Sequence, residues 1–439
     1  ALRLIYQRDY QQDDQIADHL SIRYADLFRT PMDGIQQTAG EKLSIHNPYV
    51  KLLYSFQDWL LDTEVGYRST TGTVGAQTFS LIGNSAPPFS DRLTSMEYRF
   101  QELYLKQQFS RTLGKFKLSG GVDFSSINLS YSNLAITTPE QLRDVIVQPN
   151  AALEFKFSNR SKISLNAAHR RELPAPNQLI SVPYLSDHQT LMQGLDTLYL
   201  QRSNTIGLRY NYANSFRQLT YFAQLQRTTI PNGLQRSLGV SSLFTVQFLT
   251  AGFPSSSTQV SGGISKYLDW LRGTVDLRSR LVQFTNQLEI NDQLEQNVFQ
   301  VLDTKLKYLA TINKWLKLSL RAGYKRSENI NRGATEQAPT LDHAYYSGAG
   351  ITAQLAKKTS FNVKADAYRW SQNQQTTPTT LMAASFRHGF ASGVTIRIEG
   401  SNLLNQGTFF QNYVNSYQVS QRSFLLRPRT ILGGITWGF

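Results

Sequence analysis

Cysteine is absent from this chain of 439 residues. Without thiols there is no disulfide framework, no thiolate metal site and no cysteine nucleophile. Long apolar runs are also missing: hydrophobic residues make up 40% of the chain, and the mean hydropathy is −0.35. A helix needs about 20 apolar residues to cross a membrane, so the sequence excludes a bundle of membrane-spanning helices.

Catalytic motifs are lacking too. No Gly-x-Ser-x-Gly elbow, phosphate-binding loop or dinucleotide fingerprint stands in a supporting context. The histidines have no metal-ligand spacing and no paired carboxylate beside them. We therefore expect neither an enzyme nor a metal site nor a cofactor. The six histidines are His19, His46, His169, His188, His343 and His388.

Acidic residues are fewer than basic residues, 31 against 45. The formal net charge is +14 and the isoelectric point is about 9.7. In a soluble protein such a balance suggests nucleic acid as a partner. Here the basic residues are spread over alternating segments and do not form a cluster, so a polar lumen and loops with a basic bias explain them better. No nucleic-acid partner is expected.

What the chain does have is alternation, most clearly in its last segment, residues 425–439. Counting back by twos from Phe439 places Trp437, Ile435, Gly433 and Ile431 on one face. A period of two with one apolar face is typical of a strand. An apolar face that continues to a terminal aromatic residue suits an outer-membrane barrel, where that face meets lipid.

Alternation recurs along the chain between short polar turns. After residue 315, for example, Leu316, Leu318 and Leu320 alternate with Lys317 and Ser319. A soluble β-sandwich would alternate as well, but many such runs in series, with a charged opposite face, favour one large meander. Eight short turns recur: 57–59, 111–114, 158–161, 213–215, 268–270, 312–314, 356–359 and 390–393.

The turns give a strand number. Eight hairpins with strands of about ten residues make about 16 strands, and the last segment adds another. Residues 1–7 can form one more, followed by a loop from about Gln11 to Gly40. The sequence thus predicts an all-β, transmembrane, antiparallel up-and-down barrel with about 18 visible strands, in a single domain spanning residues 1–439.

Tryptophan marks one rim of this predicted barrel. Trp59, Trp270 and Trp315 lie at short turns, and Trp437 lies near the end of the last strand with Phe439. Amphipathic aromatic side chains concentrate at membrane interfaces, so these five residues are the expected girdle. Tryptophans that cap a soluble core would not gather at one rim. Short turns are periplasmic in outer-membrane barrels, which predicts a periplasmic C-terminus.

The C-terminal segment resembles a known family. Asn402-Leu403-Leu404-Asn405 follows the penultimate strand, and Leu426-Arg427-Pro428-Arg429-Thr430 leads into the Gly-rich strand that ends at Phe439. This arrangement is similar to the C-terminus of TonB-dependent outer-membrane receptors, and Arg-Pro-Arg is most like those of the Bacteroidetes. The resemblance is specific over roughly the last forty residues.

That family combines an N-terminal plug domain, a motif that engages the TonB protein, and a barrel of 22 strands. The resemblance therefore implies that this chain is the C-terminal part of such a barrel, incomplete at its N-terminus, and that the loop between Gln11 and Gly40 is extracellular. It also implies a Gram-negative outer membrane and, as partners, outer-membrane lipid, a plug domain and the TonB complex. A surface lipoprotein is a further possible partner.

Three functions follow as hypotheses. The first is TonB-dependent import of a bulky nutrient that binds at extracellular loops and the plug. The second is a passive outer-membrane porin, and the third is a structural barrel subunit of a surface or secretion assembly. A plug domain encoded upstream of residue 1 would support the first, and a signal peptide there would support the second.

Two sets of residues are candidates for binding. Aromatic side chains predicted on long loops can contact a ligand or a lipoprotein, or can pack loop against loop; they are Tyr184, Tyr199, Phe244, Phe248, Phe253, Tyr345, Tyr346, Phe409, Phe410 and Tyr413. Basic side chains on the predicted lumen face can attract anionic solutes or an acidic plug surface, or can form ion pairs between neighbouring strands; they are Arg272, Arg278, Arg280, Lys305, Lys307, Lys317 and Arg321.

Overall fold

The computed structural model describes residues 2–20, 34–81, 88–133, 140–179, 184–187, 190–195, 197–240, 245–333, 339–372, 375–414 and 419–437. Strands dominate these residues, and two short 3-10 helices, η1 (Pro176–Leu179) and η2 (Asp269–Leu271), interrupt them. Among the described residues, no helix reaches the length and apolar character that a membrane crossing requires.

The strands fall into three groups. The first group is β1 (Leu2–Leu20), β2 (Gly34–Phe56), β3 (Trp59–Leu81), β4 (Pro88–Leu113), β5 (Phe116–Asn133), β6 (Glu140–Ser158) and β7 (Ser161–Glu172). The second is β10 (Gln201–Asn214), β11 (Leu219–Val240), β12 (Thr245–Leu268), β13 (Gly273–Ile290), β14 (Gln293–Asn313), β15 (Leu316–Arg332), β16 (Thr340–Ala356), β17 (Thr359–Gln372), β18 (Gln375–Gly389), β19 (Val394–Ser401) and β22 (Thr430–Trp437). The third is the short strands β8 (Tyr184–Asp187), β9 (Thr190–Gln193), β20 (Thr408–Val414) and β21 (Val419–Leu425).

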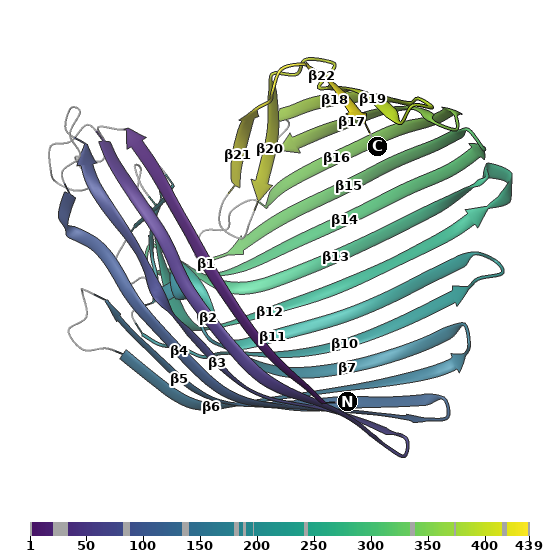
Figure 1. The fold of residues 1–439 in the computed structure, drawn as a ribbon. Coiled ribbons are helices and arrows are strands. Elements are labelled where there is room, and N and C mark those ends of the chain that lie inside the picture. Colours follow the sequence, from purple (N-terminus) through teal and green to yellow (C-terminus); the bar gives the residue numbers. More distant parts are fainter. Residues whose placement is uncertain are drawn as a thin grey trace.

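The long strands form one curved antiparallel meander (Figure 1). The main sheet has 20 strands, and without the short β8 and β9 it has 18, as the sequence predicts. Each long strand pairs with the next long strand along the chain, β7 with β10 and β19 with β22 included. Within the described residues, β1 pairs only with β2 and β22 only with β19, so these two strands are the edges of the sheet.

The eight predicted short turns are all present between paired strands. Successive connections of a meander alternate between its two ends, so these eight lie together at what we call the short-turn end. At the opposite, long-loop end, the sequence prediction misses one tight turn. Asn291 and Asp292 join β13 to β14 with φ angles of 48° and 64°, the left-handed pair that a two-residue hairpin requires.

Strand lengths differ from the prediction. β2 has 23 residues and β4 has 26, whereas about ten suffice to cross a membrane. The expected loop between Gln11 and Gly40 is also wrong over most of its length, because β1 continues to Leu20 and pairs with β2 from Gly34 onward. The physical reason is that backbone pairing does not stop at the membrane boundary, and continued ladder bonds extend the hairpins beyond it.

The pleat separates two faces. On one face, Leu153, Leu165, Leu208 and Leu225 form a row across β6, β7, β10 and β11, and each is more than 40% exposed. Charged residues alternate with such rows on the other face, toward which the sheet curves. We call the leucine face outward and the charged face inward. Exposed apolar rows on a convex sheet are the outward face that a transmembrane barrel needs.

The long-loop half of the inward face contains an apolar core. Leu129, Tyr131 and Met96 of the sheet are at most 2% exposed, and they belong to the same cluster as Leu179 of η1 and Leu195, which follows β9. The connection between β7 and β10 therefore folds back over the inward face. β9 fixes its position by pairing in parallel with β12, from Thr190 opposite Thr245 onward.

Replacing Leu179 by alanine should loosen this connection. Leu179 is fully buried, and removal of a buried leucine side chain costs about 2–5 kcal/mol, part of it from the cavity left behind. We expect chymotrypsin to cleave the folded, detergent-solubilised variant faster between residues 173 and 200. Leu208→Ala, which shortens a leucine 42% exposed on the outward face, is the control and should match the wild type. Equal cleavage of both variants would contradict the packing.

Candidate functional site

The inward face of β13–β19 carries an excess of positive charge. Register places ten cationic side chains there against six carboxylates, Asp276, Glu295, Asp303, Asp342, Asp366 and Glu399. We call this surface the basic wall. Its cations are Arg278, Arg280, Lys305, Lys307, Lys317, Arg321, Lys325, Lys364, Arg387 and Arg397.

Ion pairs neutralise only part of the basic wall. Arg278 pairs with Asp276 at 2.9 Å, Lys305 with Asp303 at 2.6 Å, and Arg397 with Glu399. Arg321 and Lys364 both pair with Asp366. Within the described residues no ion pair involves the other five of the ten cations, which leaves their charge available. They are Arg280, Lys307, Lys317, Lys325 and Arg387.

The facing wall is balanced. Among the described side chains of β2–β5, the inward face carries four cations and four carboxylates. Three ion pairs join them, and the pair between Lys51 and Asp62 measures 2.9 Å between Nζ and Oδ2. The other two pairs are Lys106 with Glu64 and Arg68 with Glu102. Since β2–β5 and β13–β18 lie on opposite sides of the curved sheet (Figure 1), the field across the enclosed space points away from the basic wall.

One carboxylate organises the centre of the basic wall. Asp366 of β17 pairs with Arg321 of β15 and, at 3.0 Å, with Lys364. Arg321 must reach across β16 to make this contact, and it can do so because Gly348 of β16 lies between the two strands with no side chain. Gly323 likewise has no side chain, which leaves room for the ring of Tyr346 to lie over the glycine backbone.

Aromatic side chains border the basic wall at its long-loop side. Phe409 of β20 meets Tyr368 of β17 edge to face, with ring centroids 5.6 Å apart. Phe409 also packs near Phe424 of β21. The β20–β21 hairpin therefore leans over the inward face of β17.

The structure places the predicted aromatic residues in varied surroundings. Phe248 and Phe253 lie in β12, and Tyr345 and Tyr346 lie in β16, so the prediction that these four occupy loops is wrong. The extended hairpins explain the error, because the strands continue where loops were expected. Tyr346 lies on the inward face, whereas Tyr345 lies on the outward face against Tyr324 and His343.

The remaining predicted aromatic residues lie near the connections. Tyr199 precedes β10, donates a hydrogen bond to the carbonyl of Asn232, and has a pKa raised above the usual value for tyrosine by burial. Phe409 belongs to β20, as described above. Tyr184 lies in β8, Phe410 and Tyr413 lie in β20, and Phe244 lies outside the described residues.

Six of the seven predicted lumen cations belong to the basic wall. The exception is Arg272, which lies in the turn before β13 with a φ of 48° and donates from Nη1 to the carbonyl of Ile312 at 3.0 Å. The prediction that Arg272 lies on the lumen face of a strand is wrong, because η2 extends to Leu271 and the alternation of β13 begins only at Gly273, not at Leu271 as expected. The sequence prediction did not assign Arg387 to the lumen, although its alternation with Phe386 and His388 could have done so.

The predicted girdle residues gather at the short-turn end. Trp59 contacts Phe109 edge to face at 5.8 Å between ring centroids, and its ring lies beneath the guanidinium of Arg111. Trp270 and Trp437 are 79% and 69% exposed, and Trp315 is also exposed. Phe439 lies outside the described residues.

No group of three or more histidine, aspartate or glutamate side chains in the described part of the chain is arranged to hold a metal ion. The basic wall presents guanidinium and ammonium groups beside aromatic rings. Guanidinium and ammonium groups bind carboxylates and phosphates with charge-assisted hydrogen bonds, and the adjacent rings of Tyr346 and Tyr368 offer apolar contact area.

Comparison with known proteins gives a likeness of fold. No protein-family model and no curated protein matches the chain. Among solved structures, the ferric yersiniabactin uptake receptor FyuA from Yersinia pestis aligns with a TM-score of 0.50 at 11% identity, covering 98% of this chain and 67% of that one. The ferric-catecholate import receptor Fiu from E. coli K12, in its closed form, aligns at 0.49 and 10% identity, over 98% and 60%.

The siderophore receptor PirA from Pseudomonas aeruginosa aligns at a TM-score of 0.41 and 10% identity, over 85% of this chain and 70% of that one. The chain thus spans between 60% and 70% of the length of these three proteins. At such identities the likeness is one of fold. The alignment with FyuA agrees with the antiparallel meander described above, which is a fold of outer-membrane β-barrel type.

The role of Gly348 can be tested by adding a side chain. In Gly348→Val the new carbons would meet both Arg321 and Asp366, so the pair between them must break. We expect a loss of about 1–3 kcal/mol, the usual cost of overpacking, measured from the guanidinium midpoint of the protein refolded in lipid vesicles. Gly434→Val is the matched control, because nothing lies within 4 Å of a Cβ at Gly434. Equal losses would show that strand glycines matter only for backbone freedom.

Proposed function

We propose that this chain is the barrel of a TonB-dependent outer-membrane transporter that imports a bulky, anionic nutrient. The observation that carries the proposal is the asymmetric lumen, with ten cations and six carboxylates on β13–β19 against a balanced opposite wall. The fold likeness to an uptake receptor supports it, as does the C-terminal resemblance at Asn402–Asn405 and Arg427–Arg429.

The orientation follows the general rule for such barrels. Short turns are periplasmic and long connections extracellular, so the short-turn end, with Trp59, Trp270 and Trp315, faces the periplasm together with the C-terminus. The β7–β10 connection and the β20–β21 hairpin then face outward from the cell and narrow the extracellular mouth. The Arg-Pro-Arg sequence at 427–429 supports a source among the Bacteroidetes.

In this orientation a nutrient first meets the aromatic side chains at the mouth, among them Phe409 and Tyr368. Its anionic groups are then attracted toward cations of the basic wall that form no ion pair within the described residues, among them Arg280, Lys307 and Lys325. A plug domain would occupy the lumen at rest and would be displaced by force transmitted through TonB. The same cations would hold an acidic plug surface between transport cycles. The chain acts by binding and passage, without chemical conversion of the nutrient.

Energy coupling is the first test. In a strain that lacks its own iron receptors, cells expressing the full-length protein should grow on a panel of ferric chelates, or take up labelled anionic glycans or peptides, only when TonB is present. Uptake driven by TonB distinguishes a plugged transporter from a porin. Equal uptake with and without TonB would overturn the proposal in favour of passive diffusion.

Charge on the basic wall is the second test. Replacing Lys307, Lys317 and Lys325 together by glutamine should lower the uptake of the anionic substrate found in the first test by about tenfold, since each lost charge weakens attraction in a confined, low-dielectric space. Arg326→Gln removes an outward-facing arginine from the same strand pair and should leave uptake unchanged. A triple variant with normal uptake would show that these lysines serve structure or the plug alone.

A further inference from the structure

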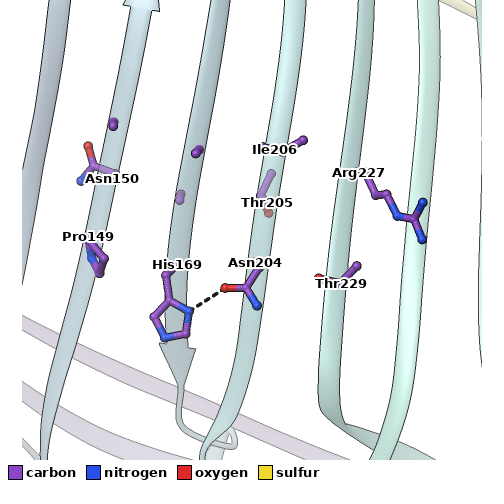
Figure 2. A pocket seen from close by; sticks show the side chains of 11 residues that line it. Pro149, Asn150, His169, Asn204, Thr205, Ile206, Arg227 and Thr229 are labelled. Carbon is purple, nitrogen blue, oxygen red and sulfur yellow. Dashed lines mark hydrogen bonds between the residues drawn. The ribbon is translucent and has the colours of Figure 1, made fainter.

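A concave site lies on the outward face of β6, β7, β10 and β11. A groove of about 530 Å³ crosses β6, β7, β10 and β11, within the ~300–1,000 Å³ range of small-molecule sites. Its floor is formed by Ala151 and Ala167, Ile206 stands at one side, and its rim is polar, from His169, Asn204 and Arg227. Figure 2 shows His169, Asn204, Ile206 and Arg227 on neighbouring strands.

The register shows why a groove forms here. Ala151, Ala167, Ile206 and Arg227 face one another across the four strands, directly beside the row of leucines that begins at Leu153. Ala151 and Ala167 are paired across β6 and β7. Because alanine is much shorter than leucine, the surface is lower there than at the adjacent pair Leu153 and Leu165. The neighbouring Ile206 is 58% exposed and forms one bank of the groove.

One hydrogen bond holds two side chains of the polar rim in place, and other donors of the rim stay available. His169 Nδ1 donates to Asn204 Oδ1 at 2.7 Å (Figure 2), which fixes both side chains and turns the amide NH₂ of Asn204 into an available donor. Arg227 is exposed. Among the residues that the structure describes, it has no ion pair or hydrogen bond, and its nearest neighbours in the outward row are the uncharged Ile206 and Thr258. The groove thus presents donors and positive charge beside an apolar floor.

The position of the groove along the membrane normal indicates which part of the membrane lies beside it. Asn204 lies eight residues along β10 from Tyr212, which stacks on Tyr221 near the short-turn end. At ~3.3 Å per residue and a tilt of ~40°, this separation is roughly 20 Å along the membrane normal. The apolar band of such barrels is ~25 Å tall. The rim therefore lies near the far boundary of the band, where lipid headgroups begin on the long-loop side.

We propose that this groove binds a phosphate-bearing lipid of the outer leaflet. The phosphate receives hydrogen bonds from the Arg227 guanidinium and the Asn204 amide, and one acyl chain lies across Ala151 and Ala167 against Ile206. Arginine binds phosphate through two parallel N–H bonds, and an arginine that faces lipid is costly unless such a partner is present. Arg202, exposed two residues beyond Asn204 on the same face, adds charge on the headgroup side. This inference rests on the membrane orientation given under the proposed function, but not on transport.

The test measures lipid retained by the purified full-length protein. Native mass spectrometry of the wild type, extracted from Gram-negative outer membranes in a mild detergent, should show one phosphate-bearing lipid that survives washing. In the double variant Arg227→Gln/Asn204→Ala, retention should fall about tenfold. Arg326→Gln, which removes an outward arginine outside the groove, should retain lipid as the wild type does. Heat-dependent gel mobility confirms that each variant is folded.

A second variant separates a lipid from a free anion. Ala167→Phe fills the floor and leaves Arg227 and Asn204 in place, so it should also lose the lipid. Inorganic phosphate at millimolar concentration should not displace lipid from the wild type. Retention unchanged in Arg227→Gln/Asn204→Ala, retention unchanged in Ala167→Phe, or full displacement by inorganic phosphate would each overturn the proposal. Loss of lipid with normal TonB-dependent uptake would leave this site supported and independent of the proposed function.

Discussion

The ladder of backbone hydrogen bonds between antiparallel strands is the constraint on which the rest of this molecule depends. Within a membrane no water is available to satisfy an amide or a carbonyl, so a chain without long apolar helices can cross only as paired strands. The meander of 18 long strands satisfies this condition by local pairing of chain neighbours. Because each strand pairs with its successor, a period of two in the sequence becomes two continuous surfaces in space.

Those two surfaces carry opposite chemistry, and register keeps them separate. Leu165 lies opposite Leu208, and Leu208 opposite Leu225, so apolar side chains meet apolar side chains from strand to strand. On the inward face, Glu64 lies opposite Lys106 and Asp303 opposite Lys325. A slip of one residue would exchange the faces of a whole strand. The asymmetry between the basic wall and the balanced wall is therefore fixed by the same ladder that fixes the fold.

Much of this architecture could be predicted from the sequence, because its signals are local. The short turns carry residues suited to tight reversals, such as Asp58 and Gly114, whose φ is +56°. The alternation around Lys317 assigns that side chain to the inward face. By contrast, the extension of β1 beyond Gln7 could not be predicted. The sequence around Asp13 and Asp14 shows no apolar alternation, and the extension depends on pairing with residues from Gly34 onward, which are distant in sequence.

Contacts between residues distant in sequence were beyond prediction as well. The parallel pairing of β9 with β12 places Thr190 opposite Thr245, and no local sequence pattern predicts this pairing. The Arg321–Asp366 pair depends on a third strand that supplies Gly348. Tyr345 and Tyr346 are adjacent in sequence but lie on opposite faces, a difference that the prediction of a loop at these residues could not anticipate.

The outward groove shows what register adds to composition. In the sequence, Arg227 is one of 45 lysines and arginines in a basic chain, and a count of charges assigns it to the lumen or a loop. Its alignment with Ile206 and Ala167 places it instead on the face of the leucine rows. On the same face Glu328 balances Arg326, but no ion pair within the described residues balances Arg227, and the ladder prevents its side chain from turning inward. The same pairing that satisfies the backbone thus requires Arg227 to find its partner in the membrane.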